Sequence, residues 1–313
     1  MTNTHSDAWG LTTVPPSMLV IGGGDTGAQV ASIFNAFGTK IQLFQTGPRI
    51  LPIADEDVSA EMASAFRESG INVREQFGTI ASFEKTATGL RMNFSKDGVQ
   101  DYAEAALAVV AVGWVANTSG LNLAAVGVEL NERGFVKVDD YMQTSSSHVF
   151  AAGDVTGRLM LVPQALQEGF VAATNAVQGP TLPYGNPVSP VGSFTDPEYA
   201  QVGLTEAKAR EKSDIITAIV RFDSFARPII DGRKVGFCKL IVDRNTHQIL
   251  GCHVVGERSV DITQIAAIAM SAGMRVNDLL SIPLSFPTYS GVLVRAAADA
   301  ARQLKLEVSW NEG

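Results

Sequence analysis

Residues 18–27 read MLVIGGGDTG and join a short apolar strand to a glycine-rich turn. The pattern G-x-G-x-x-G falls on Gly22, Gly24 and Gly27, directly before a predicted helix over residues 27–37. The first glycine permits a tight turn, the second lets backbone N–H groups approach a diphosphate, and the third allows close helix–strand packing. The helix N-terminus then faces the anion. This stretch predicts dinucleotide binding, with a purely structural glycine turn as the alternative.

Strand and helix alternate through the first half of the chain. Alternation of this kind, with buried apolar strands, is typical of a parallel sheet covered by helices. The first half therefore predicts an α/β domain. Strands are predicted at residues 18–21, 40–44, 71–77 and 106–112, helices at 27–37 and 58–69, and a hairpin or meander at 79–94.

The second half has a different pattern. A strand at 149–152 and a helix at 163–177 lead into residues 179–187, where glycines and prolines predict a domain boundary. Strands then precede helices, which is typical of an α+β domain. The strands are predicted at 200–203, 215–222, 236–242 and 249–255, and the helices at 260–272 and 290–304. The predicted segments are a leader or linker over 1–16, followed by 17–140, 141–185 and 186–313.

Composition limits the function classes. The 313 residues are 46% apolar and carry a net charge of −8, which argues against a nucleic-acid partner. No apolar run approaches the roughly 20 residues of a membrane span, so no membrane association is expected. The first ten residues lack the apolar core of a signal peptide, so we expect a cytoplasmic location.

Cysteine and histidine provide no recognisable catalytic or metal site. Cys238 and Cys252 lie in apolar strands without C-x-x-C or zinc spacing, so we expect two buried, reduced thiols. None of the four histidines falls in a pattern with an acid and a nucleophile. We therefore assign no catalytic residue and expect no metal site.

The end of the second strand decides between the two nicotinamide cofactors in many dinucleotide-binding folds. An acid about 20 residues after the glycine motif binds the ribose 2′-OH of NAD. Here Gln45 provides a hydrogen-bonding group without charge. Arg49 is able to pair with a 2′-phosphate bidentately, or is a solvated loop arginine. The sequence leaves NADH and NADPH both open.

Several motifs follow one another in the order found in the pyridine nucleotide-disulfide oxidoreductases, a family that includes dihydrolipoamide dehydrogenase and mercuric reductase. Nearly all of the chain resembles this family. The motifs are IGGGDTG at 21–27, RILP at 49–52, AVG at 111–113 with NT at 117–118, VFAAGDV at 149–155, FTDPE at 194–198, VGLTE at 202–206 and GCHVVG at 251–256.

The resemblance implies a fold and cofactors for each segment. Residues 17–140 would form a Rossmann-like NAD(P)H domain, 141–185 the returning remnant of an FAD domain, and 186–313 an α+β dimerisation domain of a homodimer. Asp154 would hydrogen-bond the ribityl or pyrophosphate region of FAD. Trp114 stands where the family has an arginine. The residues implied for the nicotinamide dinucleotide are Gly22, Gly23, Gly24, Asp25, Thr26, Gly27, Gln45, Arg49 and Gly113.

Three features of the family are missing. The chain holds no second G-x-G-x-x-G and no redox disulfide, both of which belong to the family's first FAD segment. Phe286 and Gly291 stand where the family has its acid/base histidine and glutamate. The resemblance therefore implies an FAD-dependent NAD(P)H oxidoreductase of cell redox homeostasis without dithiol/disulfide activity. The alternatives are a non-catalytic NAD(P)-binding homodimer and an inactive truncation that exposes apolar surface.

Overall fold

A computed structural model describes residues 2–185 and 188–306. The chain divides into two compact units, which are treated separately below. The first unit runs to Val112 and resumes at Val188, and the second lies between these positions. Among the helices of the described residues, none combines the length and the apolar composition that a membrane crossing requires.

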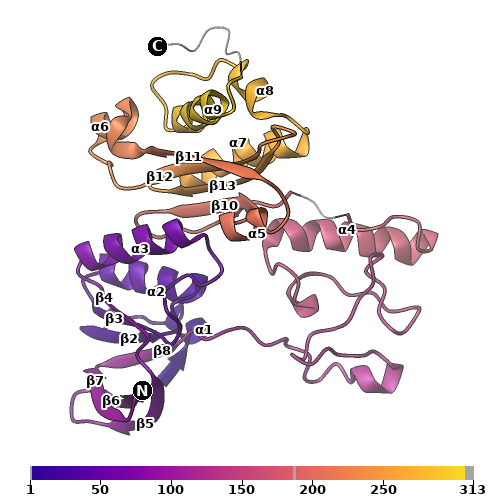
Figure 1. The fold of residues 1–313 in the computed structure, drawn as a ribbon. Helices are drawn as coiled ribbons and strands as arrows, with labels where there is room; N and C mark the ends of the chain where they lie inside the picture. Colours follow the sequence, from indigo (N-terminus) through magenta and orange to yellow (C-terminus); the bar gives the residue numbers. More distant parts are fainter. Residues whose placement is uncertain (1, 186–187, 307–313) are drawn as a thin grey trace. The chain divides into compact units, whose positions relative to one another are not determined.

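A parallel five-stranded sheet is the framework of the N-terminal half of the first unit. Its strand order is β1-β8-β2-β3-β4, and each neighbouring pair is parallel. Helices α2 and α3 connect successive strands, as the alternating pattern predicts (Figure 1). The elements are β1 (Thr2–Thr4), α1 (His5–Ala8), β2 (Ser17–Ile21), α2 (Asp25–Ala36), β3 (Lys40–Gln45), α3 (Glu56–Glu68), β4 (Asn72–Glu75) and β8 (Leu107–Val110).

Strand β2 is apolar throughout because both faces of this sheet are covered. Met18 and Val20 pack against apolar side chains of α2 and α3. Leu19 and Ile21 point to the opposite face, where they pack against a three-stranded antiparallel sheet. That sheet consists of β5 (Thr79–Lys85), β6 (Leu90–Lys96) and β7 (Val99–Ala105).

An antiparallel sheet of order β11-β12-β13-β10-β9 forms the C-terminal half of the same unit. Helices α7 and α9 cover one face of it (Figure 1). On the other face, Tyr199, Phe237 and Val255 join the core formed by α2 and α3. The elements are β9 (Val191–Gly192), β10 (Tyr199–Gly203), α5 (Glu206–Arg210), β11 (Ile215–Arg221), η3 (Phe222–Ser224), α6 (Ala226–Asp231), β12 (Phe237–Asp243), β13 (Ile249–Val255), α7 (Ser259–Ser271), α8 (Val276–Leu280) and α9 (Gly291–Gln303).

The second unit is largely irregular. It contains η1 (Leu123–Val126), η2 (Gly153–Thr156) and α4 (Val162–Gln178). Asn175 of α4 stabilises the surrounding loops, because its side-chain amide forms hydrogen bonds with backbone groups of Tyr141, Thr181 and Leu182. The strand predicted at 149–152 is wrong. Phe150 makes only an isolated bridge to Gln143, since the described part of this unit offers no neighbouring strand.

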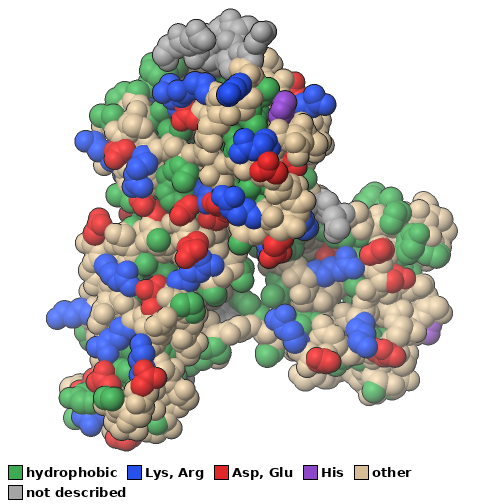
Figure 2. All heavy atoms as spheres, viewed as in Figure 1, with side chains coloured by type: hydrophobic (Ala, Val, Ile, Leu, Met, Phe, Trp, Pro, Cys, Tyr) green, Lys and Arg blue, Asp and Glu red, His purple; other side chains and the backbone are tan. Residues whose placement is uncertain are grey.

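Helix α4 carries an exposed row of apolar side chains, although Val171 and Ala172 of the same helix are buried. Gln164 and Glu168 are buried against the loops of the unit, and Glu168 accepts a hydrogen bond of 2.7 Å from the Gly153 N–H. Figure 2 shows hydrophobic side chains gathered over this helix, and the residues that expose them are Val162, Leu166, Phe170 and Val177. Their spacing places them along one helical stripe. An exposed stripe of this kind is typical of a surface that another element covers.

The predicted fold class is confirmed: an α/β part is followed by an α+β part. Most predicted helices and strands agree with the structure to within two residues. The sequence predicts a leader or linker over residues 1–16. The structure adds Thr2–Thr4 to the edge of the parallel sheet, because its backbone pairs with β8. Residues 113–140, placed in the dinucleotide segment on sequence grounds, lie in the second unit.

Candidate functional site

The glycine turn between β2 and α2 is tight because backbone packs directly on backbone. Gly22 has φ +105°, and its N–H donates to the Phe44 carbonyl at 2.9 Å. A Cβ on Gly22 would lie 2.4 Å from the Ala111 oxygen, and one on Gly27 would lie 1.8 Å from the Gly22 oxygen. Neither position accepts a side chain, so both glycines are required by packing alone.

Beside Gly24 the turn is open. A Cβ built on Gly24 meets no atom within 4 Å. Among the described residues, the N–H groups of Gly24, Asp25, Thr26 and Gly27 have no hydrogen-bond acceptor. The first N–H groups of a helix without partners attract an anion, and the helix dipole adds to this attraction. The turn therefore presents four donors beside an open space.

Gln45 helps to fix the shape of the turn. Its Oε1 accepts a hydrogen bond of 2.9 Å from the Gly23 N–H, and the Gly23 carbonyl accepts one of 2.6 Å from the Leu51 N–H. Since the amide oxygen is used, the amide NH₂ group of Gln45 is the part that a ligand would meet. Gln45 thus combines a structural bond with a neutral donor at the end of β3.

Arg49 is held by its own loop. Its Nη2 donates to the Pro52 carbonyl at 3.2 Å and to the Ala54 carbonyl at 3.3 Å. These two bonds give Arg49 a structural role that needs no ligand. Its other guanidinium nitrogens are still able to donate to one. The structure therefore places Gln45 at the end of β3 and Arg49 on the loop that follows it.

The first residue of α2 has a partner that sequence reasoning missed. The hydroxyl of Tyr199 on β10 donates a hydrogen bond of 2.6 Å to Oδ1 of Asp25. Tyr199 is buried, and both this burial and the Asp25 charge raise the pKa of its phenol well above the ordinary value. The two residues are 174 positions apart, so no local pattern connects them.

Two further predicted residues lie in the second unit. Gly113 has φ +150°, a conformation that favours glycine. Asp154 lies on η2 with its side chain exposed. It is therefore accessible to a ligand. The nearby Glu168, which sequence reasoning also missed, accepts a hydrogen bond from the Gly153 N–H.

The segment that carries the acid/base residues in the resembled family has other side chains here. Phe286 is 78% exposed and has no proton to exchange. A Cβ on Gly291 would lie 2.7 Å from the ring of Phe225, so a glutamate at this position has no room. The described residues therefore place no acid/base pair at this position.

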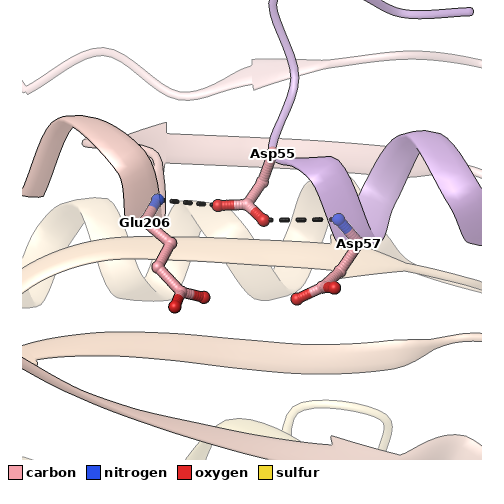
Figure 3. Close-up of side chains that lie close together, drawn as sticks. All are labelled: Asp55, Asp57 and Glu206. Atoms are coloured by element: carbon pink, nitrogen blue, oxygen red, sulfur yellow. Dashed lines mark hydrogen bonds between the residues drawn. The ribbon is translucent and has the colours of Figure 1, made fainter. Parts of the chain in front are cut away.

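A buried lysine lies among three carboxylates. Figure 3 shows Asp55, Asp57 and Glu206 converging from the starts of α3 and α5. The Nζ of Lys239 is 2.9 Å from Asp55, 2.6 Å from Asp57 and 2.6 Å from Glu206. The three carboxylates alone would suit a cation. The lysine ammonium takes that place, so the cluster joins β12 to the start of α3.

The charges of this cluster stabilise one another. Burial alone would raise the pKa of Asp55, but hydrogen bonds from the Glu206 N–H and from Lys239 outweigh it and lower the value. Burial alone would lower the pKa of Lys239, but its three carboxylate partners raise it. Burial lowers the pKa of the neighbouring His253, whose Nε2 donates to the Leu204 carbonyl at 2.9 Å.

Comparison with known proteins divides the chain into two matched segments. The sequence profile of the pyridine nucleotide-disulphide oxidoreductases matches residues 2–169, and that of the dimerisation domain of these proteins matches residues 189–297. The chain is 33% identical over 285 residues to a mercuric reductase of Lysinibacillus sphaericus, across 91% of this chain and 52% of the relative. It is 34% identical over 294 residues to a dihydrolipoyl dehydrogenase of Thermus scotoductus, across 93% of this chain and 63% of the relative.

Solved structures share the fold. The copper(II) complex of a hypochlorite-induced flavoprotein disulfide reductase from Escherichia coli superimposes with a TM-score of 0.87 at 23% identity, over 95% of this chain and 67% of that chain. The chain spans about half the length of the first curated relative that it matches.

Proposed function

The chain belongs to the pyridine nucleotide-disulphide oxidoreductase family, and from this premise we propose that it is the nicotinamide-dinucleotide-binding part of an FAD-dependent NAD(P)H oxidoreductase without dithiol/disulfide activity. The observation that carries the proposal is the glycine turn, whose four unpartnered N–H groups border an open space beside Gly24. The lack of an acid/base pair at Phe286 and Gly291 supports the second part of the proposal.

The residues of the turn suit a dinucleotide. Backbone donors of Gly24, Asp25, Thr26 and Gly27 would hold the diphosphate, and the α2 dipole would stabilise its charge. The NH₂ group of Gln45 would donate to the adenosine ribose. A neutral NH₂ group is able to donate to a 2′-hydroxyl or to a 2′-phosphate oxygen, so we propose that the protein uses both NADH and NADPH.

The residues available for FAD provide only part of a site. Asp154 would accept hydrogen bonds from the ribityl hydroxyl groups, since a carboxylate only accepts. A flavin, when bound, would take up the hydride of the reduced nicotinamide. A ligand of this size is normally buried over most of its surface, and an exposed Asp154 gives few walls. Stable FAD binding therefore requires more protein than residues 113–187.

A second candidate function rests on that incomplete site. Without a bound flavin, the chain would bind NAD(P)H and turn nothing over. The segment matched by the dimerisation profile supports a homodimer through residues 186–313, and the exposed Ile229, Ile230 and Phe286 give it apolar surface to bury. We further propose a cytoplasmic location and a role in cell redox homeostasis.

Nucleotide titration tests the proposal. NADH and NADPH are titrated by fluorescence into the wild-type chain, a Gly24→Val variant and a Gly185→Val control, with and without added FAD. Gly24 and Gly185 both have open space around them, so the fold should survive in both variants. We expect binding by the wild type and the control and none by Gly24→Val, because the valine fills the diphosphate space.

The absorbance spectrum separates the two candidate functions. A flavin band in the purified protein favours the oxidoreductase, and a colourless protein that still binds NADH favours the binding protein. A chain that binds neither nucleotide, or a Gly24→Val variant that binds both as well as the wild type, contradicts the proposed site.

A further inference from the structure

We propose that Tyr199 is a positioning residue for dinucleotide binding, which keeps the Asp25 carboxylate away from the N–H groups that receive the diphosphate. The inference rests on the proposed function and concerns the regulation of affinity at the same turn. Asp25 is the first residue of α2, and its carboxylate adds a negative charge where an anion has to bind.

The geometry gives the carboxylate two possible sets of donors. One is the Tyr199 hydroxyl on β10, at 2.6 Å. The other is the set of unpartnered N–H groups at the start of α2, which includes those of Thr26 and Gly27. A carboxylate in the first turn of a helix is attracted by these groups and by the dipole. Tyr199 therefore competes with the diphosphate site for Asp25.

The surroundings fix Tyr199 in this role. Its side chain is 4% exposed and belongs to the core shared by α2, α3 and the antiparallel sheet. A second contact holds the same two segments together, because the Asp196 N–H donates to the Ser32 hydroxyl of α2 at 2.9 Å. The phenol therefore cannot move with the carboxylate, and the hydrogen bond fixes Asp25 on the β10 side of the helix.

The consequence for affinity depends on the charge of Asp25. Two unit charges about 4 Å apart in a solvated site interact by about 1 kcal/mol, which corresponds to about fivefold in affinity. Loss of the Tyr199 hydroxyl frees the carboxylate to bond the diphosphate donors and should weaken binding by about fivefold. Loss of the Asp25 charge removes the competitor, so the Tyr199 hydroxyl should then no longer matter.

A double-mutant cycle tests this mechanism. The full chain and the variants Tyr199→Phe, Asp25→Asn and Tyr199→Phe/Asp25→Asn are titrated with ADP-ribose, which carries the diphosphate without the nicotinamide, and their melting temperatures are measured in parallel. We expect weaker binding by Tyr199→Phe, equal or tighter binding by Asp25→Asn, and recovery to the Asp25→Asn affinity in the double variant.

A purely structural role of Tyr199 gives a different result. The Tyr199→Phe change would then weaken binding by the same factor in both backgrounds, in step with the melting temperature, and this would overturn the inference alone. If neither the wild type nor Asp25→Asn binds ADP-ribose, the proposed dinucleotide site is wrong and the inference falls with it.

Discussion

Replacement of Lys239 by methionine should strongly destabilise the first unit. Methionine keeps most of the volume of the side chain but removes the ammonium that neutralises three carboxylates at 2.6–2.9 Å. Lys239 is 1% exposed and Asp55 is 3% exposed, so water cannot replace the lost partner at Asp55. The variant therefore contains a buried carboxylate without its cation.

The expected magnitude follows from the burial of each group. Removal of one partner from a buried ion pair costs about 3–5 kcal/mol, and this applies to Asp55. The side chains of Asp57 and Glu206 are 47% and 27% exposed, so solvent screens them and their mutual repulsion adds about 1 kcal/mol or less. We expect a loss of about 4 kcal/mol in the free energy of unfolding at pH 7.

Urea denaturation at two pH values provides the assay. The lowered pKa of Asp55 means that, in the wild type, the stabilisation is present above about pH 4 and is lost only as the pH falls through the still lower folded-state value. In the variant, acid neutralises the unpaired carboxylates, so the difference from the wild type should shrink between pH 7 and pH 4.5. Lys208→Met, at an exposed lysine of α5, is the control. A loss below about 1 kcal/mol, or one that is the same at both pH values, would refute this account of the cluster.

Three other predictions concern separate features. Gln45→Glu keeps an acceptor for the turn but adds a charge, so it should weaken NADPH binding about tenfold more than NADH binding; equal effects in a fluorescence titration would contradict the placement of the ribose. His253 has a pKa that burial lowers, so the unfolded chain binds its proton first and stability should fall as the pH drops below about 6.5. His253→Gln should reduce that fall in thermal denaturation, and an unchanged pH profile would speak against it. Leu166→Gln with Phe170→Gln should lower the binding of an apolar fluorescent dye far more than Val99→Gln, an equally exposed side chain of the first unit, and equal losses would show that the stripe on α4 is not the dye site.

Local pattern was sufficient for most of the fold. The apolar run of β2 and the glycine turn after it predicted a buried parallel strand followed by α2, because both signals depend on residues close in sequence. The same reasoning failed at 149–152, where an apolar run lacks a neighbouring strand. Helix α4 was predicted, but periodicity cannot tell which face of a helix its neighbours cover, and here Gln164 and Glu168 are buried while Leu166 and Phe170 are exposed.

The candidate site was predictable only in part for the same reason. The glycines and Gln45 lie within 24 residues of one another, and their roles follow from a known spacing. Tyr199 and Lys239 meet their partners only because the antiparallel sheet packs on α2 and α3, which no spacing in the sequence reports. The lack of room for a larger side chain at Gly291 likewise depends on Phe225, which comes from a distant segment.

The links between the two halves of the first unit decide how the protein can be dissected. Asp25, Ser32 and Asp55 each find a hydrogen-bonding partner beyond residue 188, and Tyr199 and Phe237 insert into the N-terminal core. A fragment cut at residue 112 would keep its glycine motif but would expose the core surface that Tyr199 and Phe237 cover. It would also leave the Asp25 carboxylate beside the dinucleotide site without its Tyr199 partner. The nucleotide affinity of such a fragment would therefore differ from that of the full chain because these contacts are lost.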